Sequence, residues 1–151
     1  MADNLISEQY IIFTLGEEEY ALPIQIVDEI VKVETLIPVP RSKKYFAGIM
    51  DIRGKVVNMI DLAVKLGIKN EGAHPERAII INTFQKPTGI LVDRVSHVVH
   101  LPPTAIDPPP PSVKGISSRY IVGVGKKDNR FIILIDIGKI MSAEDLSEIM
   151  S

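Results

Sequence analysis

The sequence of 151 residues contains no cysteine. Disulfide bonds, thiolate zinc sites and cysteine nucleophiles are therefore excluded, and the composition suits a reducing compartment. Apolar runs such as FIILI and AIII are far shorter than the roughly 20 residues that a membrane helix needs. The N-terminal stretch MADNLISEQY lacks the apolar core of a secretory signal. We expect a cytoplasmic protein with no direct membrane insertion.

Neither sign of charge dominates, since 17 basic residues stand against 19 acidic ones and the net charge is −2. The chain therefore has no broad field that would attract nucleic acid or anionic lipid. Arg41, Lys43 and Lys44 lie beside Tyr45 and Phe46, and such a cluster can stack on nucleic acid. A cluster this small is more typical of a solvated turn, so we expect no nucleic-acid partner.

Short β-branched and aromatic segments, separated by turn residues, fill most of the chain, and they are typical of strands. Asp61 is predicted to cap a short helix, LAVKL, that ends at Gly67. A second short helix is predicted at the C-terminus, over 142–150. The predicted strands are 9–15, 20–24, 26–33 (with room for one helical turn), 48–52, 55–60, 78–84, 89–93, 94–101, 120–125 and 131–136.

An internal repeat relates the two halves of the chain. Residues 10–24 align with residues 78–92 at an offset of 68 (78 − 10). Further along, residues 60–62 resemble residues 135–137 at an offset of 75 (135 − 60). The first offset also matches Val27 with Val95 and Ile30 with Val98. Chance similarity between two strand-rich segments is the competing explanation.

Two similar halves with many short strands favour an all-β fold of two small closed barrels packed together, because closure removes exposed strand edges. A β-sandwich is the alternative. The polar segment 67–77 is rich in glycine and charge, and it is the best internal boundary. We place one subdomain at 16–77 and the other at 78–141, with the strand 9–15 as a candidate addition to the second. A groove is expected between the halves.

Residues with catalytic or metal-binding chemistry are present but are not arranged for it. His97 and His100 are three apart in a predicted strand, so their side chains point to opposite faces and cannot share a metal. Asp61 and Asp136 occupy matching strand ends, where helix caps are expected rather than an acid–base pair. Glycine-rich phosphate loops are also missing from the sequence. We expect no metal, no cofactor and no catalytic residue.

Six stretches occur in an order that resembles the CheW family of chemotaxis coupling proteins: FTLGEEEYALPI, VDEI, IPVPRS, GIMDIRG, MIDL and GILVDRVSHV. The resemblance covers nearly the whole chain and implies a single CheW-like domain over 1–151, built from two SH3-like five-stranded barrels with short helices. It also implies a non-enzymatic adaptor. Such an adaptor joins the regulatory domain of the histidine kinase CheA to the cytoplasmic tips of chemoreceptors, is recruited to membrane-associated receptor arrays, and is monomeric when free.

The sequence departs from the family pattern at two positions near the GIMDIRG motif. Many members carry asparagine where this chain has Asp51, and proline where it has Asn58. The first change places a carboxylate beside Arg53, and the second restores a backbone N–H. Neither change removes the arginine.

The resemblance implies that Arg53 and Glu29 take part in receptor coupling. Because a guanidinium group can hold a carboxylate with two hydrogen bonds, we hypothesise that Arg53 pairs with Glu29 and orders Val27 and Ile30. Val98, the repeat counterpart of Ile30, would line the same groove and help to seat one receptor helix. The alternatives are a solvated turn arginine and three ordinary core residues.

Kinase contacts are expected away from the receptor site, because an adaptor must hold both partners at once. The resemblance points to the first barrel for the main contact and to the proline-dense loop 101–112 for a second. An ordinary rigid crossover is the alternative for that loop. The candidate residues are Pro38, Pro40, Tyr45 and Phe46 in the first barrel, and Asp107 and Pro111 in the loop.

Two rival functions remain open at this point. One is a small enzyme that uses Asp61, Asp93 or a histidine. The other is a general peptide-binding module of the SH3-like type.

Overall fold

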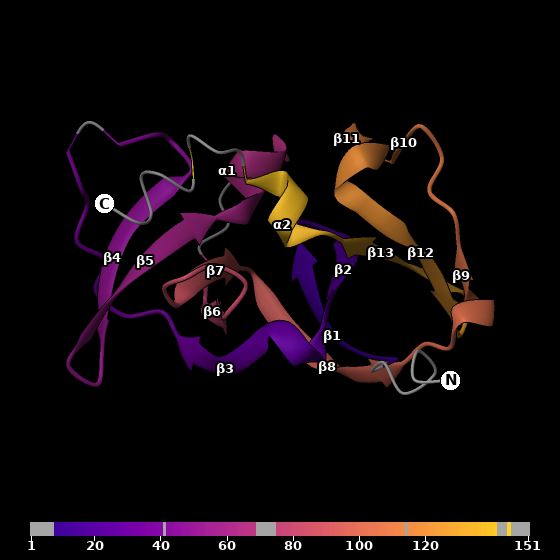
Figure 1. Cartoon of the computed structure of the whole chain (residues 1–151), viewed down its shortest axis with the longest axis horizontal. Helices are drawn as coiled ribbons and strands as arrows, with labels where there is room; N and C mark the ends of the chain where they lie inside the picture. Colours follow the sequence, from indigo (N-terminus) through magenta and orange to yellow (C-terminus); the bar gives the residue numbers. More distant parts are fainter. Residues whose placement is uncertain (1–7, 41, 69–74, 114, 142–144, 146–151) are drawn as a thin grey trace.

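The computed structural model describes residues 8–40, 42–68, 75–113, 115–141 and 145 (Figure 1). Most of these residues lie in strands, which form a six-stranded, a five-stranded and a two-stranded sheet. The two large sheets correspond to two SH3-like barrels, so the predicted fold class is confirmed. The predicted C-terminal helix over 142–150 lies outside the described residues, apart from Asp145.

The first barrel is the sheet of order β3-β6-β7-β5-β4, and the second barrel is the sheet of order β8-β1-β2-β13-β12-β9. The strands of the first barrel are β3 (Val27–Lys32), β4 (Phe46–Ile52), β5 (Lys55–Asp61), β6 (Arg77–Ile81) and β7 (Thr88–Val92). Those of the second barrel are β1 (Gln9–Leu15), β2 (Glu18–Pro23), β8 (Arg94–His100), β9 (Ile106–Asp107), β12 (Ile121–Lys127) and β13 (Arg130–Ile135). The remaining elements are β10 (Ser112–Val113), β11 (Ile116–Ser117), α1 (Leu62–Leu66), α2 (Ile137–Ile140) and the 3-10 turns η2 (Ile24–Ile26), η3 (Pro103–Ala105) and η4 (Ser118–Tyr120).

The two halves of the chain exchange their first hairpins. The hairpin β1–β2 pairs with β8 and β13 of the second half, whereas the hairpin β6–β7 pairs with β3 and β5 of the first half. The predicted division into 16–77 and 78–141 therefore assigns β2, β7 and most of β6 to the wrong barrel. The division failed because it assumed that each barrel uses consecutive strands, whereas each contains a parallel pair that needs a long crossover.

The strand register confirms the internal repeat residue by residue. Ile11 on β1 pairs with Val98 on β8, and Ile79 on β6 pairs with Ile30 on β3. The offset of 68 (79 − 11) relates Ile11 to Ile79 and also Ile30 to Val98, so the two pairs are equivalent. Both strand pairs also carry a register shift at the same place, so that β3 and β8 each contain a bulge. Shared irregularities of this kind are typical of common architecture rather than of chance similarity.

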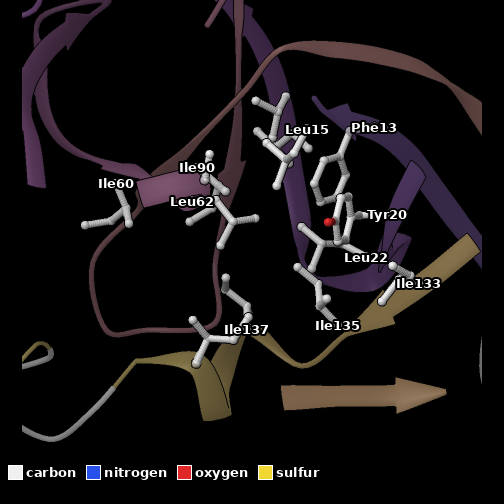
Figure 2. Packing of buried hydrophobic residues seen from close by; sticks show 14 of the residues in the cluster. Phe13, Leu15, Tyr20, Leu22, Ile60, Leu62, Ile90, Ile133, Ile135 and Ile137 are labelled. Atoms are coloured by element: carbon white, nitrogen blue, oxygen red, sulfur yellow. The ribbon is translucent and has the colours of Figure 1, made fainter. Parts of the chain in front are cut away.

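One hydrophobic core is shared by both barrels (Figure 2). Phe13 and Tyr20 of the second barrel stack with their ring centroids 6.0 Å apart, and they belong to the same cluster as Ile60 and Ile90 of the first barrel. Two smaller clusters, one in each barrel, lie apart from this cluster. Because the largest cluster spans both sheets, the two barrels pack as one body.

The helices α1 and α2 occupy matching positions after the last strand of each half. Asp61 accepts a hydrogen bond from the Val64 backbone N–H at 3.2 Å, and the helix ends at Gly67 with φ of 73°. Asp136, the repeat counterpart of Asp61, accepts from the Lys139 N–H at 3.2 Å. Both aspartates are therefore helix caps, as the sequence predicted.

Candidate functional site

The hairpin β4–β5 turns at Arg53 and Gly54, between the paired residues Ile52 and Lys55. Arg53 and Gly54 both have positive φ, at 53° and 86°, as a two-residue type I′ turn requires. A side-chain oxygen of Asp51 accepts a hydrogen bond from the Gly54 N–H at 2.7 Å. The turn is thus held from within the hairpin, and it presents the Arg53 side chain to solvent.

Arg53 pairs with Glu29, as the sequence predicted. Its Nη2 atom lies 2.5 Å from Oε2 of Glu29 on β3, and the two side chains are 71% and 33% exposed. The hydrogen bond to Glu29, together with the negative charge of that carboxylate, raises the pKa of Arg53. Because β3 and β4 are the two edges of the sheet, the ion pair links the open edges of the first barrel. An ion pair this exposed adds little stability, so its main effect is on side-chain position.

The three apolar residues predicted for the receptor groove lie on the edge strands β3 and β8. Ile30 and Val98 are 39% and 44% exposed, so the alternative of ordinary core residues is wrong for both. Val27 is half-buried and packs against the shared core, and its part in the receptor contact stays a prediction. In Figure 1, β3 and β8 run along one side of the molecule, with α1 and α2 toward the other. The groove between the halves stays a prediction.

A pocket of about 450 Å³ opens between the proline-dense loop and the sheet of the second barrel. Asp107, a predicted contact residue, lies in its wall, whereas Pro111 is exposed and its carbonyl oxygen accepts from the Ser118 N–H at 3.0 Å. The rim is charged, since Asp107 pairs with Lys126 at 3.0 Å and Glu19 pairs with Arg130 at 3.2 Å. The apolar part of the lining includes Pro108, Pro110, Val113, Val124, Phe131 and Ile133.

The corresponding end of the first barrel holds the other predicted contact residues. Pro38 and Pro40 are exposed and lie in the same loop as Ile37. Ile37 is 55% exposed and forms an isolated antiparallel β-bridge with Ile49 on β4. Tyr45 and Phe46 are half-buried. The two prolines are therefore better placed for a contact than the two aromatic residues.

Tyr45 belongs to an internal cluster rather than to an open surface. Its ring packs against the shared core, and Nζ of Lys65 lies 4.6 Å from the ring centroid. The same ammonium group forms an ion pair with Asp145 at 2.9 Å, and the Asp145 side chain is 4% exposed. The Lys65 side chain of α1 therefore covers the Tyr45 ring.

Sequence reasoning missed two exposed apolar residues at the ends of the barrels. Val56 on β5 is 68% exposed and Phe131 on β13 is 66% exposed. They are repeat counterparts at the offset of 75 (131 − 56). The offset of 75, applied to the hairpins 48–60 and 120–136, aligns Val56 with Phe131 and is the signal in the sequence that relates them.

Comparison with known proteins supports the same family. Residues 9–145 match the family model described as the CheW-like domain. The chain belongs to the CheW family. The chemotaxis protein CheW of Klebsiella aerogenes is 32% identical, over 97% of this chain and 89% of that protein. The CheW of Treponema pallidum is 30% identical, over 99% and 91%. A crystal structure of the scaffolding protein TtCheW from Thermoanaerobacter tengcongensis superposes with a TM-score of 0.82 at 31% identity, covering 91% of this chain and 94% of that one.

The two departures from the CheW pattern fit the hairpin without disturbing it. Asp51 caps the turn through a side-chain oxygen, and the asparagine found in many CheW proteins carries an oxygen at the same position. Asn58 lies within β5, opposite Ile49 on β4 and beside Thr88 on β7. Both residues are therefore compatible with the CheW fold.

Several of the groups considered for catalysis have structural partners in the described part of the chain. Asp93 accepts a hydrogen bond from the Gly16 N–H at 2.7 Å, and His100 pairs with Glu8 at 2.8 Å. Within the described ranges, no group of three or more histidine, cysteine, aspartate or glutamate residues is placed to hold a metal ion. The helices in the same ranges are too short or too polar to cross a membrane.

Proposed function

We propose that this protein is a non-enzymatic adaptor that couples the cytoplasmic tips of chemoreceptors to the histidine kinase CheA. The observation that carries the proposal is the ion pair between Arg53 and Glu29 on the surface of a CheW-family chain. The proposal includes a cytoplasmic protein that is monomeric when free and is recruited to membrane-associated receptor arrays.

The receptor contact is centred on β3 and β8. Arg53 holds Glu29 in place, and Ile30 lies one residue further along the same strand. Val98 supplies an exposed apolar residue at the equivalent position of β8. Exposed apolar residues on two edge strands suit an amphipathic helix, whose apolar stripe would cover them.

The kinase contacts lie at the outer ends of the barrels. Pro38 and Pro40 are exposed at the end of the first barrel, and Asp107 lines the pocket of the second. Proline-rich walls lose little conformational entropy when a partner binds, which favours such surfaces for docking. Because these ends are distinct from β3 and β8, both partners can bind the same molecule.

The mechanism is positional. The exchanged hairpins and the shared core make the barrels one body, so a receptor that moves β3 also moves the kinase-binding ends. A coupler of this kind changes kinase activity by changing where the regulatory domain sits relative to the receptor. No chemical step in the adaptor itself is needed.

Reconstitution tests the proposal. Receptor, CheA and this protein are combined, and ATP turnover is measured with and without attractant. We expect the protein to raise kinase activity in a form that attractant suppresses, and to increase the CheA that sediments with receptor-bearing membranes. Kinase activity that does not respond to addition of the protein would contradict the proposal.

One observation favours a second candidate function. The pocket of about 450 Å³ lies within the size range of ligand sites, and prolines form part of its wall. A general peptide binder would use this pocket alone. Such a protein would not increase the CheA that sediments with receptors, so the same reconstitution separates the two functions.

A further inference from the structure

The turn between β4 and β5 contains a residue that is unusual for its backbone conformation. Arg53 has a positive φ of 53°. This is the left-handed region of the backbone, which residues other than glycine, asparagine and aspartate rarely adopt. The following position holds Gly54, which adopts positive φ at little cost. Arginine at the first position therefore needs support from outside its own residue.

The repeat provides an internal comparison for this turn. Asp128 and Asn129 occupy the equivalent turn between β12 and β13, and they have φ values of 52° and 64°. Aspartate and asparagine tolerate this conformation without extra support. The position equivalent to Asp51 is Lys126, whose ammonium group cannot accept a hydrogen bond. The backbone has the same shape in both barrels, but only the turn that holds an arginine carries a side-chain acceptor at this position.

We infer that Asp51 is a positioning residue for Arg53. Its side-chain oxygen binds the Gly54 N–H at 2.7 Å and fixes the turn, so that the guanidinium group of Arg53 is directed at Glu29. The carboxylate acts through the backbone and does not itself contact the partner. The functional part of this inference rests on the proposed receptor contact, whereas its structural part concerns the hairpin alone.

The chain offers variants that separate the acceptor from the charge. Asp51→Ala removes the acceptor, whereas Asp51→Asn keeps a side-chain oxygen and removes the charge. Asp136→Ala is the matched control, because it removes a capping carboxylate from α2, in the other half of the chain. For each variant, hydrogen exchange at the Gly54 amide and the affinity for a soluble receptor cytoplasmic fragment are measured.

We expect Asp51→Ala to accelerate exchange at Gly54 by about tenfold or more, because the amide loses its acceptor. Affinity for the receptor fragment should fall several-fold, and Asp51→Asn should restore both quantities. In an Arg53→Ala background, Asp51→Ala should have no further effect on affinity, since the residue that it positions is gone. Asp136→Ala should lower thermal stability and leave both readouts unchanged.

Three results would overturn the inference: a Gly54 amide that stays protected in Asp51→Ala, a failure of Asp51→Asn to restore it, or an equal affinity loss in the Arg53→Ala background. If the unsubstituted protein does not bind the receptor fragment, the proposed receptor contact fails instead. The exchange rates at Gly54 then still decide whether Asp51 fixes the turn.

Discussion

Ile30 and Val98 occupy the same position in the two halves of the chain, and both are exposed on the edge strands of their barrels. Each pairs with an isoleucine of an exchanged hairpin, Ile79 for Ile30 and Ile11 for Val98. The exposure of both counterparts is compatible with the proposed receptor contact on β3 and β8. An exposed valine can be replaced without loss of packing, which allows a test of function apart from stability.

Substitution of Val98 by methionine is expected to leave the free energy of unfolding within about 0.5 kcal/mol of the original value, because the side chain is 44% exposed. Receptor-dependent control of the kinase should be lost, since the longer side chain alters the proposed helix seat. Thermal unfolding and reconstituted ATP turnover check the two parts. A Val98→Met protein that loses its thermal transition would identify Val98 as a packing residue.

Val27→Ala is the contrasting variant for the same surface. Val27 is half-buried and packs against the shared core, so its truncation should reduce stability by about 1 kcal/mol. The loss should appear as a lower midpoint in chemical denaturation. Equal midpoints for Val27→Ala and the original protein would show that the contact with the core is unimportant.

The ion pair between Lys65 and Asp145 is expected to stabilise the protein more than the exposed pairs do. The Asp145 side chain is 4% exposed and that of Lys65 is 21% exposed, so Asp145→Ala leaves a poorly hydrated ammonium group without this partner. We expect a loss of about 1–3 kcal/mol. Lys126→Ala is the control. The side chains of Lys126 and Asp107 are 59% and 54% exposed, so their ion pair should contribute under about 1 kcal/mol. Similar losses in the two variants would contradict the prediction.

Local sequence patterns predicted the features that depend on neighbouring residues. The helix cap at Asp61 followed from residue types within one turn, and the corner at Gly54 followed from the need for positive φ. The pairing of Arg53 with Glu29 required the family resemblance as well. Charge alone does not specify which carboxylate an exposed arginine will hold.

The exchange of hairpins could not be predicted in the same way. Whether β2 pairs with β13 depends on a parallel contact between residues far apart in the chain, such as Tyr20 and Ile133. Alternating burial within a strand indicates which face is covered but not which strand lies beside it. The exposure of Phe131 was missed for a related reason, since a strand-forming aromatic residue is usually assigned to a core.

Gly123 is expected to be essential for the placement of the proline-dense loop. A Cβ atom at this position would lie 2.8 Å from the carbonyl oxygen of Asp107 and 2.6 Å from Cγ2 of Ile106. Gly123→Ala should therefore displace β9 and reduce stability by about 1–3 kcal/mol. Binding of CheA should weaken while binding of receptor is retained, as measured by separate pull-downs. Unchanged CheA binding would separate the loop from the kinase contact.

Tyr20 should make the protein sensitive to alkaline pH. Burial, followed by the nearby charge of Glu18, raises its pKa from 10.0 to about 12. Below pH 10 the Tyr20 hydroxyl is protonated in the folded and in the unfolded protein, so its ionisation does not reduce the free energy of unfolding. Between pH 10 and 12 the unfolded chain ionises first, and stability should fall by about 2–3 kcal/mol. Tyr20→Phe should show a smaller decrease over this range, and an equal decrease would assign the effect to other groups.

The exchanged hairpins predict that neither half of the chain folds without the other. A fragment that ends within 69–74 contains β3, β4 and β5 but lacks the hairpin β6–β7 that fills the middle of their sheet. The complementary fragment lacks β1–β2, which lies between β8 and β13. Each fragment alone should unfold without a cooperative thermal transition, because most buried strands have lost their partners. The two fragments mixed together should recover the transition of the intact chain in circular dichroism and co-elute in size-exclusion chromatography. A cooperative transition in either isolated fragment would show that one barrel is stable without the exchanged hairpin.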